Sequence, residues 1–393
     1  MKKCKIIELC DVYDCLHVTP EYQQNGISMV RVSEINNAFL NLHNTMKVSE
    51  NVYNKHTETY KPQQGDIILA RVGAFLGEFA YVDTREKFCI GQNTTILHPK
   101  NFELGKYIYY NLISPRTQLR IQREAAGSAY KNVGVEAIKN FEINIPEDNQ
   151  RAKCIGDVLY EIDKKIDNNI KINHNLEELL TTIYQRWFIE FEFQDDNKKP
   201  YKSNGGKFVY NEILKQEIPT GWEVKKIKDI INVVTGKEDA NFSSENGEYK
   251  FFTCSNNTLR CNEPAFEGSS ILIAGNGDFN VKHYTGKFNA YQRTYVLIPD
   301  NVDYYCSMYI SALNKINSFK KGSNGSIVKF ITKGDVENID VIIPMQKELL
   351  KELNSILFNI EQNQNENDKL EELKKFLLPM LMNGQINVAD III

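Results

Sequence analysis

The sequence predicts an α+β fold in which two pseudo-twofold-related α/β blocks are joined by two long helices that pair as an antiparallel coiled coil. Three observations predict it. A set of features in the first half of the chain returns in the same order roughly 200 residues later, each copy ends in a heptad pattern, and a stretch rich in Pro, Gly and Asp separates the copies. The 393 residues also exceed the roughly 100–200 residues of one ordinary domain.

The composition is that of an ordinary folded protein. Hydrophobic residues make up 42% of the chain, and 20 Tyr with 20 Phe are too many aromatic residues for a disordered one. No apolar run approaches the about 18 residues of a membrane span, and no signal-peptide pattern opens the chain. We therefore expect a soluble cytoplasmic protein without a membrane partner.

The cysteines and the net charge exclude little by themselves. The 8 cysteines form no Cys-x-x-Cys pair and no histidines lie beside them at zinc-ligand spacing, so we expect free thiols and no metal site. A net charge of -4 would ordinarily count against a nucleic-acid partner. The acidic excess lies in the two predicted helical stretches, so the blocks between them are closer to neutral and permit an anionic ligand.

The repeat aligns strand-like segments of the two copies. Residues 67–73 match residues 271–277, an apolar run that ends in a glycine turn. Each copy then has a Gly-Ser-x-x-Lys loop and a short alternating strand closed by Ile-Pro. A constant offset of 200 relates Phe88, Gln92, Thr94, Leu97 and Pro99 to Phe288, Gln292, Thr294, Leu297 and Pro299. These features place the two blocks at residues 1–147 and 222–344.

A long heptad helix is predicted after each block, over residues 148–190 and 345–384. A helix of about 40 residues is about 60 Å long, too long for the inside of one small domain. The apolar stripe of such a heptad helix, its seam, most often pairs with another chain to make an oligomer. Here the chain has two seams, which can bury each other. A twofold relation between the copies makes the two helices antiparallel. Amides interrupt both seams near their centres and are predicted to set the register of the pair, namely Asn169, Asn173, Gln364 and Asn367.

Residues 191–221 have the composition of a linker, with Asp-Asp-Asn-Lys-Lys-Pro at 195–200 and a Gly-Gly pair at 205–206. Gly384 is predicted to end the second helix, which leaves residues 385–393 as a tail.

Two variable α/β blocks, each followed by Ile-Pro and a long heptad helix, resemble the DNA-specificity (S) subunit of type I restriction-modification systems. The resemblance covers essentially the whole chain, and it depends on the order and duplication of its motifs because no single motif is specific. The residues that carry it are the run Gly65-Asp66-Ile67-Ile68-Leu69-x-x-x-Gly73, the pair Gln92-Asn93, the Gly127-Ser128 and Gly325-Ser326 loops, Ile145-Pro146 and Ile343-Pro344 with Gln150 or Gln346 after them, and Ile218-Pro219-x-Gly221-Trp222.

The resemblance implies that residues 1–147 and 222–344 are target recognition domains, each reading one half of a split site on double-stranded DNA, and that the helices set the gap between the halves. It implies a non-catalytic subunit that binds methyltransferase (M) and restriction (R) subunits, with S-adenosylmethionine, Mg and ATP expected only on those partners. Because Gly275-Asn276-Gly277 replaces Arg71-Val72-Gly73, and Arg293 replaces Asn93, we expect an asymmetric site. The alternatives are a coiled-coil scaffold that binds proteins or other ligands, and a nuclease with an unrecognised site.

A search for catalytic motifs agrees with a recognition role. The sequence has no Walker lysine motif, and the glycine cluster at 275–279 lacks the pattern of a cofactor loop, so a turn is the favoured interpretation. Asp163-Lys164-Lys165 resembles the end of a nuclease motif, but its place in the heptad predicts a solvated helix surface.

Candidate DNA contacts lie in loops beside the repeated strands. Arg71 could bind guanine or a phosphate, and a surface salt bridge is equally open. The side chains of Gln92, Asn93, Gln292 and Arg293 suit adenine or guanine, or alternatively sheet-edge hydrogen bonds. Lys131 and Lys329 follow glycine loops and are predicted to bind phosphate. Further candidates are Ser128, Tyr130, Asn276, Lys282, His283 and Ser326.

Overall fold

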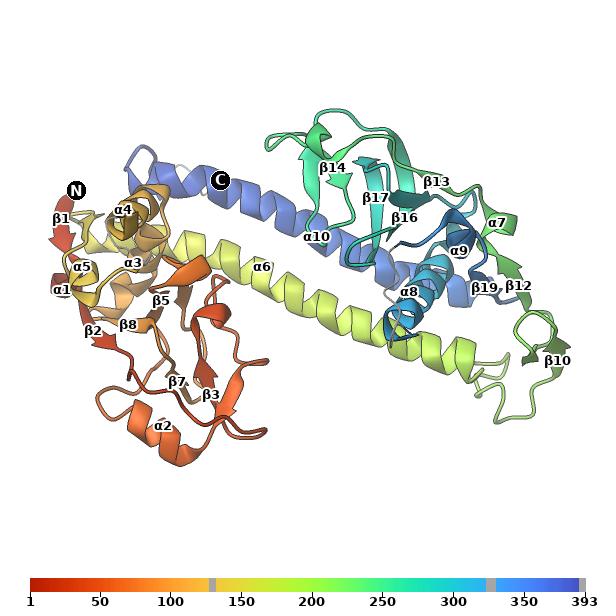
Figure 1. Cartoon of the computed structure of the whole chain (residues 1–393), viewed down its shortest axis with the longest axis horizontal. Coiled ribbons are helices and arrows are strands. Elements are labelled where there is room, and N and C mark those ends of the chain that lie inside the picture. The colour runs from red at the N-terminus through yellow and green to blue at the C-terminus, as the bar shows by residue number, and fades with distance from the viewer. Residues whose placement is uncertain (127–131, 323–329, 389–393) are drawn as a thin grey trace. The chain divides into compact units, whose positions relative to one another are not determined.

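The computed structural model describes residues 1–126, 132–322 and 330–388. The chain forms two compact units, the first of Met1–Asn169 with Glu366–Ile393 and the second of Ile170–Asn365. Each unit contains one α/β block and one half of each long helix, so the boundary falls in the middle of both helices. Figure 1 colours the chain by residue number, with the first block in red to orange, α6 in yellow-green and α10 in blue.

The described residues of the first unit form three sheets. A two-stranded antiparallel sheet pairs β1 (Lys2–Lys5) with β9 (Glu142–Ile145). A four-stranded antiparallel sheet has the order β2 (Cys10–Asp14), β8 (Thr94–Pro99), β5 (Ile67–Ala70), β6 (Phe79–Tyr81). A three-stranded sheet has the order β4 (Met46–Val48), β3 (Ile27–Val30), β7 (Phe88–Ile90), with β3 and β7 parallel.

Short helices connect these strands. The α-helices of the first block are α1 (Ile6–Leu9), α2 (Glu50–His56), α3 (Gly105–Leu112), α4 (Pro115–Ala126) and α5 (Val135–Lys139). Single 3₁₀ turns lie at Val32–Glu34, Gly73–Phe75 and Phe102–Leu104. Ser49 begins α2 as an N-cap, because its side chain accepts a hydrogen bond from the backbone N–H of Val52.

The second unit begins with a hairpin of β10 (Phe208–Asn211) and β11 (Gln216–Pro219) inside the predicted linker. A two-stranded sheet then pairs β12 (Glu223–Lys226) with β19 (Asp340–Ile343). A six-stranded sheet has the order β13 (Val234–Thr235), β18 (Thr294–Leu297), β16 (Phe266–Ala274), β17 (Val281–Ala290), β14 (Tyr249–Phe252), β15 (Leu259–Cys261). The helices are α7 (Ile227–Ile230), α8 (Tyr305–Gly322) and α9 (Lys333–Glu337), with 3₁₀ turns at Ala240–Phe242 and Val302–Tyr304.

The two blocks have the same hydrogen-bonded frame. Strand β5 pairs with β8 so that Ala70 faces Thr94, and β16 pairs with β18 so that Ala274 faces Thr294. Both blocks also contain one parallel pair, β3 with β7 and β14 with β17. The sequence repeat is therefore a repeat of fold, which confirms the prediction of two related α/β blocks.

Strand β5 of the four-stranded sheet and strand β16 of the six-stranded sheet are buried on both faces. In β5, Ile67 and Leu69 pack into one apolar cluster, while Ile68 and Ala70 pack into another. In β16, Ile271 and Ile273 face a cluster that includes the long helices, and Leu272 faces the opposite side. This burial on both faces explains why these runs are continuously apolar rather than alternating.

The two long helices are α6 (Asn149–Tyr184), which continues as a π-helical turn at Gln185–Ile189, and α10 (Lys347–Met382). They pair antiparallel within each unit, since contact positions fall along α10 as they rise along α6: Asp163 contacts Lys374, and Asn169 contacts Asn367. Gly384 ends α10 with a φ of +72°, and the N–H groups of Gly384 and Gln385 bind the carbonyls of Leu381 and Met380. The predicted glycine cap is confirmed.

No helix among residues 1–126, 132–322 and 330–388 combines the length and the apolar character that crossing a bilayer requires.

Candidate nucleic-acid interface

In the first block, the structure brings three predicted contact residues to one sheet edge. The backbone N–H of Arg71, just after β5, donates to the carbonyl oxygen of Asn93 at 2.9 Å. Asn93 adopts a φ of 66°, a left-handed conformation that Asn tolerates in a tight turn. Its neighbour Gln92 is exposed and donates to the Thr19 hydroxyl at 3.3 Å. Ser128, Tyr130 and Lys131 lie outside the described residues, and the chain rejoins this edge where the N–H of Val133 donates to the carbonyl of Arg71 at 3.1 Å.

The Arg71 side chain is buried, with 7% of its surface exposed, and forms an ion pair with Asp14 at 2.9 Å. Its Nε lies in the interior without a hydrogen-bond partner among the described residues. The sequence expectation of a guanidinium presented to DNA therefore does not describe this conformation. Of the two alternatives, the salt bridge is observed, but inside the sheet edge rather than on the surface. The reason is tertiary, because β2 brings Asp14 beside Arg71 from 57 positions away.

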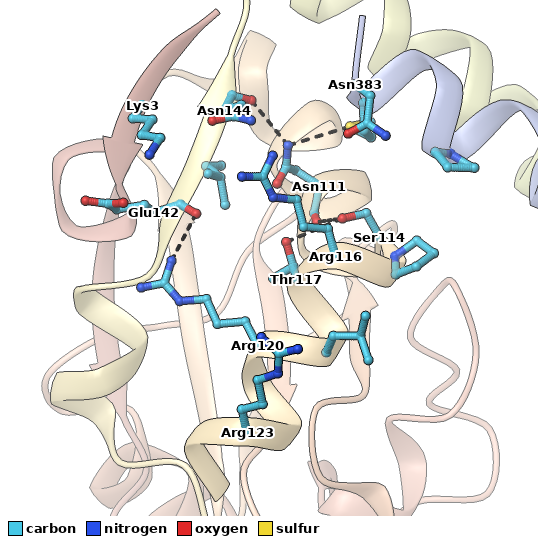
Figure 2. A pocket seen from close by; sticks show the side chains of 15 residues that line it. Lys3, Asn111, Ser114, Arg116, Thr117, Arg120, Arg123, Glu142, Asn144 and Asn383 are labelled. Carbon is cyan, nitrogen blue, oxygen red and sulfur yellow. Dashed lines mark hydrogen bonds between the residues drawn. The ribbon is translucent and has the colours of Figure 1, made fainter. Parts of the chain in front are cut away.

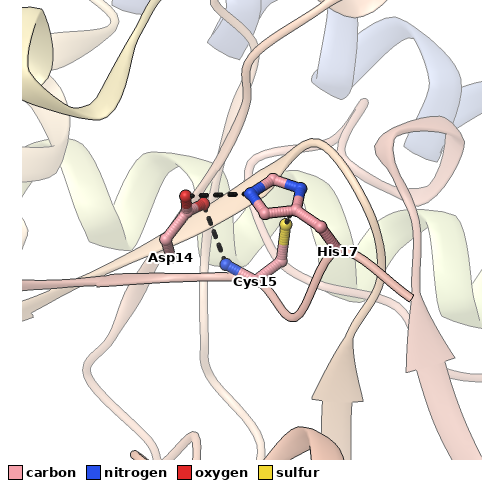
Figure 3. Close-up of side chains that lie close together, drawn as sticks. All are labelled: Asp14, Cys15 and His17. Atoms are coloured by element: carbon pink, nitrogen blue, oxygen red, sulfur yellow. Dashed lines mark hydrogen bonds and ion pairs between the residues drawn. The ribbon is translucent and has the colours of Figure 1, made fainter.

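Asp14 also belongs to the one group of possible metal ligands that the described residues offer, with Cys15 and His17 (Figure 3). His17 Nε2 lies 3.3 Å from the Asp14 carboxylate, and Cys15 Sγ lies 3.9 Å from His17 Nδ1. Burial and the nearby Asp14 charge raise the pKa of the Cys15 thiol, which disfavours the thiolate that binds metals. Since the Arg71 cation already neutralises Asp14, this group fits an ion-paired strand end better than a metal centre.

The corresponding edge of the second block has the same backbone contacts and different side chains. The N–H of Gly275 donates to the carbonyl of Arg293 at 2.9 Å, and the N–H of Ile331 donates to the carbonyl of Gly275 at 2.8 Å. The side chains of Gln292 and Arg293 are exposed there, and Asn276 is half-buried. These three predicted residues thus share one edge, while Ser326 and Lys329 lie outside the described residues.

Lys282 and His283 point to opposite faces of β17, as neighbours in a strand must. Lys282 Nζ donates to the carbonyl of Ser255 at 2.5 Å, and partial burial lowers its pKa to about 8. His283 instead packs toward α10, where its Nδ1 lies 2.7 Å from Glu361, and only 6% of its side chain is exposed. The buried Glu361 carboxylate therefore holds the ring inside in this structure, and contact of His283 with DNA stays a prediction.

The amides of the helix seam do come together. In the first unit, Asn169 Nδ2 donates to Asn367 Oδ1 at 2.8 Å. In the second unit, Asn363 Nδ2 donates to Asn173 Oδ1 at 2.8 Å. The partner of Asn173 is therefore Asn363 rather than Gln364, which is only half-buried. The four-residue shift between the two heptad patterns made the choice between neighbouring positions on α10 ambiguous from sequence.

Asp163 is not on a solvated helix surface, so that prediction is wrong. Only 3% of the residue is exposed, and its carboxylate accepts hydrogen bonds from the Tyr110 hydroxyl at 2.7 Å and from Lys374 Nζ at 2.5 Å. A heptad pattern describes only the seam between two helices, and here helix α3 covers a further face of α6. Like Asp14, Asp163 carries no signal of its own in the sequence, since its partners are distant in the chain.

Comparison with known proteins agrees with this architecture. The sequence profile of the type I restriction modification DNA specificity domain matches residues 1–178 and 219–375. The chain is 35% identical over 177 residues to the type I restriction enzyme EcoDI specificity subunit of Escherichia coli, a match that spans 43% of this chain and 40% of that subunit. It is 27% identical over 325 residues to the MjaIX specificity subunit of Methanocaldococcus jannaschii, covering 75% of this chain and 72% of that one.

Among solved structures, the S subunit of a type I restriction-modification system from M. genitalium has a similar fold. The TM-score is 0.62 at 19% identity, and the match covers 97% of this chain and 95% of that chain. The two profile matches coincide with the two structural repeats, each consisting of a block and most of its long helix. The chain therefore belongs to the family of type I restriction-modification DNA specificity subunits.

Proposed function

We propose that this chain reads a bipartite, asymmetric DNA site, one half with each block, and directs partner subunits to that site. The observation that supports this best is the pair of sheet edges, which have the same hydrogen-bonded frame and different side chains. A common frame presents both edges to a duplex in the same way, while different side chains select different bases.

The exposed groups on the two edges suit base recognition. Gln92 in the first block provides an amide, which matches adenine N6 and N7. In the second block, Gln292 adds an amide and Arg293 a guanidinium, which matches guanine O6 and N7. Because an amide and a guanidinium prefer different bases, the two halves of the site would differ in sequence.

The paired helices would set the distance between the two half-sites. Two recognition units on one face of DNA are separated by whole helical turns of about 34–36 Å, within the reach of helices the length of α6 and α10. Slippage of the helix pair would change that distance. The Asn169–Asn367 and Asn173–Asn363 hydrogen bonds oppose slippage, since any other register would leave amides against apolar side chains.

In this proposal the chain is a non-catalytic subunit in the cytoplasm. Methyl transfer and cleavage would be carried out by M and R subunits, which would hold S-adenosylmethionine, Mg and ATP. The chain contributes the position on DNA, and the target adenine would be flipped into a pocket of the M subunit.

Methylation mapping tests the proposal. The purified chain with its M subunit and S-adenosylmethionine should methylate a two-part site, and the chain without the M subunit should not methylate DNA. Exchange of residues 222–344 for the block of a relative should alter one half-site alone. Changes in both halves, or methylation by the isolated chain, would contradict the proposal.

A further inference from the structure

A pocket of about 660 Å³ opens in the first unit beside the first turn of α4 (Figure 2). Its walls come from α4, from strands β1 and β9, and from the C-terminal end of α10 at Pro379, Met382 and Asn383. The pocket is separate from the sheet edge with the predicted base contacts, because none of Arg71, Gln92 and Asn93 lines it.

The lining of this pocket is strongly basic. Arg116, Arg120 and Arg123 recur at helical spacing along one side of α4, and Lys3 of β1 adds a fourth cation. Glu142 is the one carboxylate in the lining, and Arg120 donates to its backbone carbonyl at 3.4 Å rather than to its carboxylate. Across the described parts of the chain, none of the four cations forms an ion pair with an acidic side chain.

Like charges gathered in a concave wall repel one another, and an anion in the pocket would relieve that repulsion. Lys3, Arg116 and Arg123 are exposed, so solvent screens this repulsion in part, and an anion in the pocket would meet several cations that no described carboxylate pairs with.

The pocket also contains uncharged groups of the kind that bind phosphate oxygens. The first turn of α4 has N–H groups without an intrahelical partner, and Asn144 and Asn383 add amides from two further segments. Ser114 and Asn111 shape the wall instead, since the Ser114 hydroxyl donates to the carbonyl of Asn111 at 2.6 Å and Asn111 Nδ2 donates to the carbonyl of Asn144 at 3.2 Å. Amides, arginines and a helix N-terminus are common phosphate contacts.

The second unit offers an internal comparison. There, α8 and the long helices enclose a smaller pocket of about 260 Å³. Its lining includes Asn314, Asn317 and Glu177, with apolar side chains such as Leu313 and no arginine or lysine. Its walls come from α6, β17, α8 and α10, without β12 and β19, the equivalents of β1 and β9, so this pocket is not the counterpart of the basic one.

We propose that the pocket of the first unit is a binding site for phosphate groups. Two kinds of molecule carry the phosphate groups that this site would bind: DNA, through its backbone outside the first half-site, and free nucleotides. Arginine forks bind either one in the bidentate manner that lysine cannot provide.

Inorganic pyrophosphate is the first probe, measured by calorimetry with the full chain. The variant Arg116→Gln/Arg120→Gln keeps helix propensity and side-chain length while removing two charges. It should weaken pyrophosphate binding by at least about tenfold, since two charge-assisted hydrogen-bond donors are lost. Arg186→Gln, an exposed arginine of the π-helical turn, is the matched control and should bind like the wild type. Equal binding by the wild type and the double variant, or no binding by either, would overturn the proposal.

Two further arms identify the source of the phosphate. If it is DNA, pyrophosphate competes with a duplex, and the double variant binds all sequences more weakly with a salt slope lower by up to about 2 units. If it is a nucleotide, ATP binds the wild type, and duplex binding is the same in both proteins. The DNA arm depends on the proposed function, whereas the pyrophosphate and ATP arms do not. A chain that binds pyrophosphate and no DNA would therefore reject the proposed function and retain this site.

Discussion

The edges of the two blocks differ most where β5 and β16 end. In the first block, Arg71 lies against Asp14 and is buried. In the second block, Gly275 is equivalent to Arg71, because the N–H of each donates to the residue just before β8 or β18. Thr235 is equivalent to Asp14, because Asp14 pairs with Thr95 and Thr235 pairs with Tyr295, 200 positions later. A Cβ added at Gly275 would lie 2.6 Å from the carbonyl oxygen of Arg293, so no side chain fits there. The backbone hydrogen bond at this position is 2.9 Å long in both edges, so the edges differ in side chains alone: a buried ion pair in the first and none at Gly275 in the second.

The two blocks also differ in the side chains that attach them to the long helices. Asp163 of α6 and Glu361 of α10 occupy equivalent positions of the repeat, and both carboxylates are buried. Asp163 is neutralised by Lys374 from the other helix, whereas Glu361 meets His283 from its own block. In both units a tyrosine hydroxyl completes the site, Tyr110 in the first and Tyr305 in the second. The buried carboxylate is retained between the copies, and its partner side chains are supplied from different elements.

The largest expected effect comes from removal of one of these carboxylates. Glu361→Ala leaves the Tyr305 hydroxyl and the His283 ring buried without their acceptor. The free energy of unfolding should fall by about 3–5 kcal/mol, measured by urea denaturation. Gln362→Ala, at the exposed neighbouring position, should change it by less than about 0.5 kcal/mol. A small effect of Glu361→Ala would show that the carboxylate does not anchor the second block.

The ion pair of the first edge is expected to have the next largest effect. Arg71→Ala and Asp14→Thr each leave a charge without its partner and should lower the free energy of unfolding by about 1–3 kcal/mol. The double variant, which removes both charges and resembles the second block, should lose less than the sum of the two. Additive losses would mean that the pair is not coupled. Methylation mapping of the same variants should show changes in one half-site alone.

The seam amides should have a smaller effect on stability and a distinct effect on spacing. Asn173→Leu/Asn363→Leu replaces a polar pair with an apolar one and should raise the free energy of unfolding by about 1 kcal/mol. The variant should also tolerate DNA sites whose spacers differ by a base pair, assayed by methylation with the M subunit. Gln364→Leu is the control, because Gln364 is not the partner of Asn173. If the control broadened spacer tolerance as much as the double variant, the Asn173–Asn363 bond would not set the register.

The smallest effect concerns Lys282, whose pKa is lowered to about 8 mainly by burial. Between about pH 8 and the ordinary lysine pKa near 10.4, the unfolded chain binds more protons at this position than the folded chain does. The contribution of Lys282 to stability should therefore rise with pH across this window. Lys282→Met removes the titration, so the difference in unfolding free energy between wild type and variant should shift in favour of the wild type from pH 8 to pH 10. An unchanged difference would show that the lysine is solvated in the folded state.

Sequence alone was enough to predict the repeat, the two long helices and the end of α10, but not the hairpin of β10 and β11 within the predicted linker. Apolar spacing predicted α6 and α10, and Gly384 predicted the end of α10, because these depend on neighbours within a few positions. The shared offset between 88–99 and 288–299 likewise predicted that β7 and β8 would recur as β17 and β18, since a conserved spacing preserves strand register.

Only the tertiary structure decided which of the predicted side chains are available to a ligand. Arg71 is buried because β2 brings Asp14 to it, His283 is held inside by Glu361, and Asp163 is covered by Tyr110. The same holds for the basic pocket, whose arginines are close in sequence but whose other walls come from both ends of the chain. Spacing along the chain specifies which residues share a face, whereas burial and charge pairing depend on segments that meet only after folding.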